Sequence, residues 1–303
     1  MNLYQVYQNY GNLGYLNIDW AYHYFRGVVP AGRINVGLPY YTRGWKGVEG
    51  GVNGYGGKAK ASQCERGTGT GTEQGCGNGA VGIDNMWFDS DPLGNELGAG
   101  SNPMWHAKNL EAGQLGTYAA QHGLDQSNPA DQLVGDYVRF YDNDAEAAWL
   151  WNAQKKVMLN IEDEQAIKAK AEYVANKGLG GIMFWEMAGD YNCYEIENGV
   201  RTKTIVPESN CQAANGKAAY FMGSTLTSLG HDILTKAGAP DMKMADPRIA
   251  LPAQKLDVTV SLVGYVTDES VAWPQTSEWQ FTNNSTQTIT EICLQHSIIN
   301  QYQ

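Results

Sequence analysis

Three side chains that could do chemistry lie close together between residues 178 and 190. Trp185, Glu186 and Asp190 come directly after the apolar run 182–184. An indole ring can stack on a flat ligand, and a carboxylate can accept hydrogen bonds or transfer a proton. These residue types at one place predict a site for a ring-bearing ligand. The alternative for Trp185 is a place in the hydrophobic core. For Glu186, a structural hydrogen-bond acceptor is preferred over an acid.

A second set of such residues follows another apolar run, at residues 34–38. Tyr41, Arg43 and Trp45 come shortly after it. A guanidinium donates several hydrogen bonds in fixed directions, and tyrosine adds a hydroxyl to an aromatic face. Tyr41 and Arg43 could therefore hold polar groups of the same ligand, although a surface salt bridge is the alternative for Arg43. Core packing is the preferred interpretation for three tryptophans: Trp45, Trp149 and Trp151.

Both sets of side chains need strands to position them. The run 182–184 has no polar alternation, which is typical of a strand buried on both faces, as in a parallel sheet. Gly178 stands where a preceding helix would end in a left-handed cap. In α/β barrels the carboxyl ends of such strands carry the ligands and the chemistry. We therefore expect both sets at the carboxyl ends of parallel strands.

A helix is predicted between the two runs, over residues 163–177. Its apolar side chains recur at helical spacing: Ile167, Ala171 and Val174. Acidic residues at its start suit the helix dipole, and Glu164 is expected to pair with Lys168. A strand, a long excursion, this helix and a second buried strand make an expanded β/α unit.

The composition excludes several classes of partner. The net charge is −11 and the pI is about 4.9, which argues against nucleic acid and against anionic membranes. No run approaches the ~20 apolar residues of a membrane helix. The five histidines are scattered without ligand spacing, so no metal and no cofactor is assigned. A neutral ligand such as a sugar fits this charge, and nine Trp and 18 Tyr supply aromatic faces.

The cysteines indicate an exported protein. Cys64 and Cys76 bracket one glycine-rich loop, and Cys193 and Cys211 bracket another. Two loop-closing disulfides are the preferred interpretation, and four free thiols are the alternative. The first residues carry neither a basic region nor an apolar core of a signal peptide. The glycine repeat at 67–72 is not a phosphate loop, because no Gly-Lys-Ser/Thr follows it.

The remaining pattern divides the chain into five segments. Helices are expected over 18–25 and 218–236, and 191–216 is expected to be a loop. Two stretches, 148–152 and 156–160, resemble a hairpin that returns to the main body. Prolines in 239–254 indicate a linker, and the alternation from Leu256 to Leu262 predicts a β-strand, with a second strand at 279–281. The expected segments are 1–45, an α+β insertion at 46–150, 151–238, the linker 239–254 and a truncated β domain at 255–303.

Two of these stretches resemble a known family. Residues 34–45 are similar to the seventh-strand motif of family 18 glycoside hydrolases, the chitinases, and 178–190 to their eighth strand. The resemblance covers roughly residues 15–237, including an insertion of the exo-acting branch. It implies an α/β fold: the C-terminal portion of a TIM (β/α)8 barrel with an inserted α+β subdomain, followed by the start of an all-β accessory domain.

The resemblance also implies an activity. Family 18 hydrolyses β-1,4-linked N-acetylglucosamine with retention, and the substrate's own acetamido oxygen attacks the anomeric carbon. Trp185 would form the floor under the distorted sugar, Tyr41 and Arg43 would donate hydrogen bonds, and Glu186 would support them. The implied partner is chitin or a chito-oligosaccharide, and the implied full-length protein is a secreted monomer.

One departure from the family pattern limits the expected activity. The family's acid lies in an Asp-x-x-Asp-x-Asp-x-Glu motif, and this chain has no such run. We therefore assign no catalytic residue and expect the chain to be inactive by itself. Two alternatives stay open: a carbohydrate-binding protein that kept the cleft aromatics without the acid, and an unrelated small α/β domain.

Overall fold

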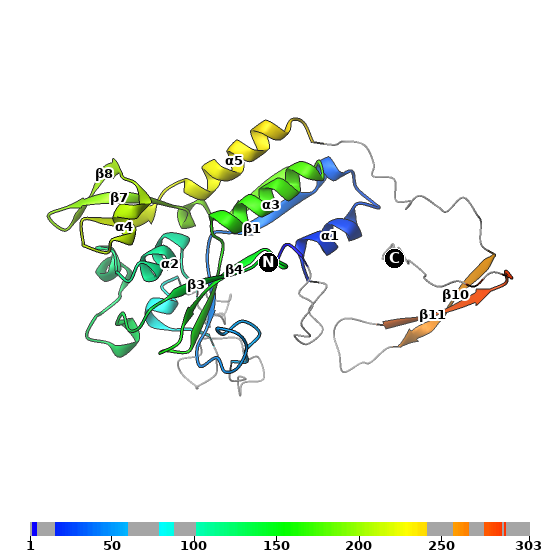
Figure 1. The fold of residues 1–303 in the computed structure, drawn as a ribbon, viewed down its shortest axis with the longest axis horizontal. Coiled ribbons are helices and arrows are strands. Elements are labelled where there is room, and N and C mark those ends of the chain that lie inside the picture. Colours follow the sequence, from blue (N-terminus) through cyan, green and yellow to red (C-terminus); the bar gives the residue numbers. More distant parts are fainter. Residues whose placement is uncertain are drawn as a thin grey trace. The chain divides into compact units, whose positions relative to one another are not determined.

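The computed structural model describes residues 2–4, 16–59, 79–87, 101–240, 257–266, 276–286 and 288 (Figure 1). The chain divides into two compact units, Met1–Met244 and Ala245–Gln303. Their boundary lies within the segment that the prolines indicate as a linker. The expected pair Cys64 and Cys76 lies outside the described residues. No helix in the described ranges is long and apolar enough to cross a membrane.

A pair of parallel strands, β1 (Asn35–Pro39) and β6 (Gly181–Trp185), connects the two predicted sets of site residues. Asn35 lies opposite Gly181, and Pro39 lies opposite Trp185. The strands are distant in sequence and run in the same direction, as the two apolar runs predict. Both carboxyl ends therefore meet at one edge.

The β1–β6 pair is covered on one face only. Val36 and Leu38 are buried, and Ile182 and Phe184 pack against the same core. Two helices that lie side by side in Figure 1 belong to this covered side: α3 (Glu164–Asn176) and α5 (Thr225–Ala237). Met183, on the opposite face, is 52% exposed. The expectation of strands buried on both faces is wrong for the described residues, because no described element covers the second face.

Helix α3 confirms the prediction of a helix over 163–177. Its three predicted apolar residues, Ile167, Ala171 and Val174, are fully buried. Asp163 caps the helix, because its Oδ1 accepts a hydrogen bond from the Ala166 amide at 2.8 Å. The expected pairing of Glu164 with Lys168 is wrong. Lys168 lies 3.9 Å from Glu172 instead, and the Glu164 carboxylate lies 3.7 Å from the Lys108 ammonium of another helix.

A four-stranded antiparallel sheet has the order β2-β5-β4-β3. Its strands are β2 (Arg43–Trp45), β5 (Val157–Ile161), β4 (Ala147–Asn152) and β3 (Val138–Asp142). The predicted hairpin is therefore β4 and β5, but it joins β2 and β3 in one sheet. The expected boundary at residue 150 falls inside β4, because pairing continues on both sides of it.

Residues 191–222 form a second antiparallel sheet, of order β8-β7-β9. Its elements are β7 (Tyr191–Glu197), β8 (Val200–Ile205), the short helix α4 (Glu208–Gln212) and β9 (Ala218–Met222). The expected loop at 191–216 and the expected helix start at 218 are both wrong. The Asn109 amide holds the Tyr220 backbone in β9 by donating to its carbonyl at 2.8 Å and accepting from its amide at 3.0 Å. Cys193 and Cys211 form a disulfide that ties β7 to α4.

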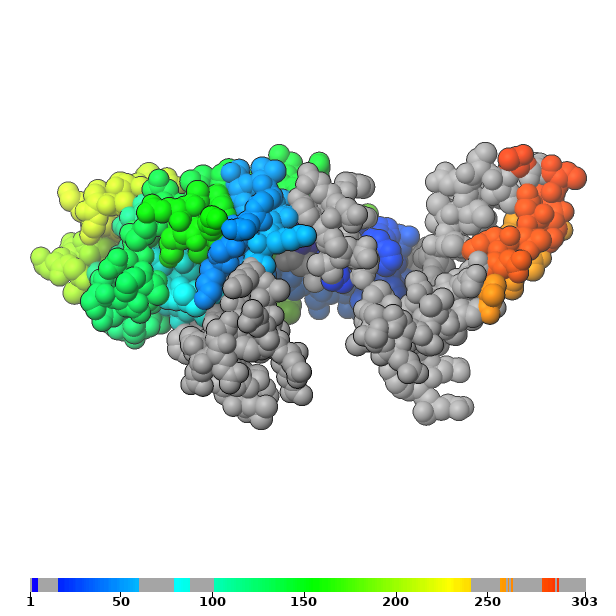
Figure 2. Space-filling view, turned by 90° about the horizontal axis from the view of Figure 1, so that it is seen from below, coloured from blue at the N-terminus to red at the C-terminus, as the bar shows by residue number. Residues whose placement is uncertain are grey.

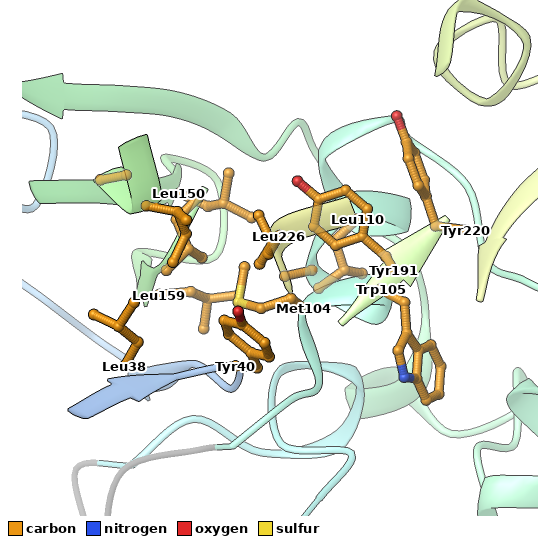
Figure 3. Packing of buried hydrophobic residues seen from close by; sticks show 14 of the residues in the cluster. Leu38, Tyr40, Met104, Trp105, Leu110, Leu150, Leu159, Tyr191, Tyr220 and Leu226 are labelled. Atoms are coloured by element: carbon orange, nitrogen blue, oxygen red, sulfur yellow. The ribbon is translucent and has the colours of Figure 1, made fainter. Parts of the chain in front are cut away.

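One hydrophobic core joins these parts of the first unit (Figure 3). Leu38 and Tyr40 from the β1 region, Leu150 and Leu159 from the β4–β5 hairpin, and Leu226 from α5 belong to the same cluster. The remaining helices are α1 (Ile18–Phe25), α2 (Met104–Glu111) and the 3₁₀ turns η1 (Ala31–Arg33), η2 (Gly82–Asp84), η3 (Ala119–His122), η4 (Pro129–Asp131) and η5 (Met187–Gly189). The insertion and the β1–β6 region thus share one core.

The second unit contains two described strands. β10 (Val258–Val266) and β11 (Thr276–Asn283) pair antiparallel, with an irregularity between Leu262 and Gly264. Both strands confirm the elements predicted from alternation and from the run at 279–281. A sheet of two strands is marginal by itself.

Candidate functional site

The open face of the β1–β6 pair carries the most exposed aromatic ring of the candidate site. Trp185 is 65% exposed at the carboxyl end of β6, and Glu186 directly after it is also exposed. Met183 shares this face with Gly37, since a Cβ on Gly37 would lie 3.2 Å from the methionine methyl group. The core alternative for Trp185 is therefore excluded. The indole offers a flat apolar surface to a ligand.

Close packing fixes the backbone around Trp185. The Tyr40 amide donates to the Trp185 carbonyl at 2.8 Å, and the Tyr40 ring stacks on Phe184 at 5.2 Å between centroids. The turn η5 presses against the same tyrosine. A Cβ on Gly189 would lie 1.9 Å from the Tyr40 carbonyl oxygen, so only glycine fits there.

Asp190 has a structural role. Its buried carboxylate accepts hydrogen bonds from the backbone amides of Tyr191 at 2.7 Å, Leu226 at 2.9 Å and Thr227 at 2.8 Å. The last two amides belong to the first turn of α5, which leaves them without partners inside the helix. Asp190 therefore anchors α5 to the end of β6.

Tyr41 and Arg43 lie together just past the end of β1. The Arg43 guanidinium carbon lies 4.7 Å from the centre of the Tyr41 ring, within the range of a cation–π contact. Tyr41 forms a bridge to Pro103, and the Thr42 amide donates to the Asn102 carbonyl at 2.8 Å. This anchoring makes the pair a preformed group with an aromatic face and several donors.

The aromatic residues of the insertion sheet are mainly core. Trp149 is 6% exposed and is stacked between Tyr55 at 4.5 Å and Phe140 at 5.7 Å. Its indole nitrogen donates to the Asn53 carbonyl at 3.0 Å. Figure 2 shows the blue segment near residue 50 lying against green residues of this sheet. The core interpretation of Trp149 is confirmed, and the loop after β2 covers this sheet face.

A buried lysine, Lys108, was not predicted from the sequence. Lys108 of α2 is 7% exposed, and its ammonium lies 3.5–3.8 Å from the carboxylates of Glu111, Glu164 and Glu208. It also lies 5.4 Å from the ring centres of Tyr191 and Tyr220. Burial alone would lower the pKa of Lys108, but the surrounding carboxylates outweigh it and raise that pKa. We call these six residues the Lys108 cluster; it joins α2, α3, α4 and the β7–β9 sheet.

The chemistry open to the candidate site is binding of a ring-bearing neutral ligand. The parallel register places β1, which precedes Tyr41 and Arg43, beside β6, which ends at Trp185. Burial raises the pKa of Tyr40 strongly, so this phenol stays protonated at neutral pH. The Asp-x-x-Asp-x-Asp-x-Glu run is absent from the sequence.

Comparisons with known proteins identify similar chains. A sequence model described as glycosyl hydrolases family 18 matches residues 2–190, and one described as chitinase C matches residues 219–292. The fold is similar to the crystal structure of a family GH18 chitinase from Chromobacterium violaceum, with a TM-score of 0.61 and 47% sequence identity. The match covers 85% of this chain and 33% of that chain.

Two curated proteins with similar sequences are also chitinases. Chitinase A1 of Niallia circulans is 27% identical over 164 residues, which is 54% of this chain and 16% of that protein. Chitinase B of Serratia marcescens is 25% identical over 162 residues, which is 54% of this chain and 26% of that protein. The chain therefore spans about a third or less of each relative's length.

Proposed function

Because this chain belongs to family 18 of the glycosyl hydrolases, a family with a TIM-type barrel, we propose that it supplies part of the substrate cleft of a chitinase. In this proposal β1 and β6 are the seventh and eighth barrel strands, and residues between them form the α+β insertion. The substrate is a β-1,4-linked polymer of N-acetylglucosamine. The disulfide between Cys193 and Cys211 is consistent with secretion.

One observation carries the proposal: a solvent-exposed tryptophan lies at the carboxyl end of β6, directly beside the end of β1. Trp185 serves as the floor under one sugar ring, whose apolar face stacks on the indole. Arg43, held over Tyr41, donates hydrogen bonds to the hydroxyl and acetamido oxygens. Glu186 accepts hydrogen bonds at the rim.

The proposed reaction is substrate-assisted hydrolysis with retention. The acetamido oxygen of the sugar attacks its own anomeric carbon while an acid protonates the leaving oxygen, and water then opens the cyclic intermediate. The chain's own residues bind and orient the sugar. The acid is not among them, since the sequence lacks the family's acidic motif.

Titration of the purified chain with chitotetraose tests the binding role. We expect Trp185→Ala to weaken binding by about tenfold or more, because stacking on an aromatic ring contributes about 1–3 kcal/mol. Trp20→Ala is the matched control, since Trp20 is 52% exposed on α1. Equal affinity of the Trp185 variant and the unaltered chain would refute the proposed floor.

Turnover of a chromogenic chitobioside tests the proposed inactivity of the chain. We expect no hydrolysis above the buffer rate at any protein concentration that gives saturable binding. Detectable turnover that scales with protein concentration would show that an acid exists within this chain.

A non-catalytic chitin-binding protein is the second candidate. The exposed Trp185 without the acidic motif favours it equally. DNA sequence upstream of the Met1 codon separates the two proposals. An in-frame Asp-x-x-Asp-x-Asp-x-Glu run favours the hydrolase, and its absence favours the binding protein.

A further inference from the structure

A cavity lies in the first unit, between α2, η3 and the strands β8 and β9. Its volume is about 460 Å³, within the ~300–1,000 Å³ range of small-molecule sites. Trp105, Tyr118, His122, Arg201, Phe221 and Met222 are among its lining residues. None of the four candidate cleft residues lines it, so it is distinct from the surface around Trp185.

The inner wall of this cavity is aromatic carbon. The Trp105 and Tyr118 rings meet edge to face at 4.6 Å, and Tyr118 meets Phe221 at 5.6 Å. The polar atoms of the first two rings are already used. The Trp105 indole nitrogen donates to the Ala188 carbonyl at 2.8 Å, and the Tyr118 hydroxyl lies 2.7 Å from His106 Nδ1. The wall therefore offers apolar surface to an occupant.

The mouth of the cavity carries hydrogen-bond donors. Arg201 is exposed, and its guanidinium lies 4.9 Å from the Tyr194 ring centre and 5.5 Å from that of Phe221. In the part of the chain that the structure describes, no carboxylate pairs with it. His122, whose ring lies 5.7 Å from that of Trp105, adds a second polar group. The aromatic contacts hold the guanidinium over the opening, where its N–H groups can reach a ligand.

We propose that this cavity is a second saccharide site, which holds one N-acetylglucosamine unit of a chito-oligosaccharide. The apolar sugar face lies on the aromatic wall, and Arg201 donates to the acetamido oxygen or a hydroxyl. The chain's net charge of −11 disfavours a polyanionic occupant. The inference rests on the proposed function for the class of ligand, but on different residues for the site.

The Trp105–Ala188 hydrogen bond links the two sites. Ala188 belongs to the turn η5, which directly follows Trp185 and Glu186. An occupant packed against Trp105 therefore restrains the segment that positions the proposed sugar floor. The cavity can hold an additional part of a bound chain while it stiffens the first site.

Calorimetric titration of the full 303-residue chain with chitotetraose tests the second site. We expect Arg201→Ala to weaken one class of sites by about fivefold or more, because a guanidinium hydrogen bond and its stacking are lost. Lys203→Ala is the matched control on the same strand, since Lys203 is exposed and does not line the cavity. Trp185→Ala should weaken the other class and leave the Arg201-dependent class measurable.

Hydrogen exchange of the unaltered chain gives a readout that needs no variant. Added chitotetraose should slow exchange around residues 117–122 and 199–201. Unchanged exchange there together with equal binding by the Arg201 and Lys203 variants would overturn the second site, while a Trp185-dependent class would still support the proposed function. Stronger protection by deacetylated chitosan tetramer or by a uronic-acid tetramer than by chitotetraose would overturn the assigned ligand class.

Discussion

His106 is completely buried between two polar groups of the insertion. Its Nε2 lies 2.7 Å from the Ile83 carbonyl oxygen and must donate to it, so Nδ1 accepts from the Tyr118 hydroxyl. Burial lowers the pKa of His106 to about 4, although the hydrogen bond to Ile83 opposes the shift. The neutral ring is therefore part of the folded structure.

The low pKa of His106 predicts a loss of stability in mild acid. An unfolded histidine takes up its proton near pH 6.5, but the folded one does so only near pH 4. Between these values the unfolded state binds more protons, so stability falls as the pH falls. We expect a loss of about 2–3 kcal/mol between about pH 7.5 and about pH 4.5 from this group, measured by urea unfolding.

The variant His106→Gln isolates this contribution, since its amide does not titrate. The difference in unfolding free energy between the variant and the unaltered chain should shrink as the pH falls from about 7.5 to about 4.5. A difference that stays constant over this range would contradict the assigned pKa.

At the scale of elements, the Lys108 cluster holds three helices together through one buried ammonium. Lys108→Met removes the cation and leaves the carboxylates of Glu111, Glu164 and Glu208 facing one another. We expect a loss of about 3–5 kcal/mol of unfolding free energy at neutral pH. In the unaltered chain, burial raises the pKa of Glu208. The charge of Lys108 opposes this shift, and the charge of Glu164 adds to it.

The effect of Lys108→Met depends on pH with a definite sign. Lys108 lowers the pKa of both Glu164 and Glu208. Without the ammonium these two pKa values rise, so the folded variant takes up protons at a higher pH than the unaltered folded chain. Its stability therefore increases relative to the unaltered chain as the pH falls toward about 4.5. Lys168→Met, which breaks only the exposed pair with Glu172, is the control and should cost under about 1 kcal/mol. A deficit that does not change with pH would contradict the electrostatic account.

The turn η5 is the element that positions the candidate site. Gly189→Ala places a methyl carbon where the Tyr40 carbonyl oxygen already lies, at 1.9 Å. The turn or β1 must shift, and either movement displaces Trp185. We expect chitotetraose affinity to fall by about tenfold or more and the melting temperature to drop by several degrees, or about 1–3 kcal/mol. Gly230→Ala in α5 is the control, because its added carbon would meet only Ile182 Cδ1, at 3.7 Å, which is an ordinary van der Waals distance. Unchanged affinity in the Gly189 variant would contradict this role of the turn.

Elements with a strong local sequence pattern were predicted correctly, whereas elements that form through contacts distant in sequence were not. Helix α3 has strong local periodicity, and β1 and β6 are short apolar runs, so the sequence predicts all three. β9 is different, because the sequence of Ala218–Met222 predicts a helix. This segment is a strand in the structure, where it pairs with β7 and its Tyr220 backbone is hydrogen-bonded to Asn109. The Lys108 cluster was also unpredictable, because its charges come from separate helices.

At the scale of the whole molecule, the sequence predicted that the candidate residues lie at the ends of two parallel strands, but it did not predict that one face of this strand pair is open. A run such as 182–184 has the composition of a strand covered on both faces, and composition says nothing about which faces receive a neighbour. In the described residues β6 has one such face covered by α3 and α5, while Met183, Trp185 and Met187 are each more than half exposed. The exposed apolar surface therefore favours association between copies of the chain, whereas the net charge of −11 opposes it.

This opposition predicts that self-association of the 303-residue chain increases with salt. Charge repulsion between copies is strong at low ionic strength and is screened at high ionic strength, whereas burial of an exposed apolar face does not depend on that repulsion. Sedimentation velocity at about 20 mM and about 500 mM NaCl should show a larger associated fraction at the higher salt concentration. Met183→Lys places a charge within the open face and should reduce this fraction. Val138→Lys, at a 49% exposed position on β3, should not. A monomer at both salt concentrations, or equal effects of the two lysines, would show that the open face does not drive association.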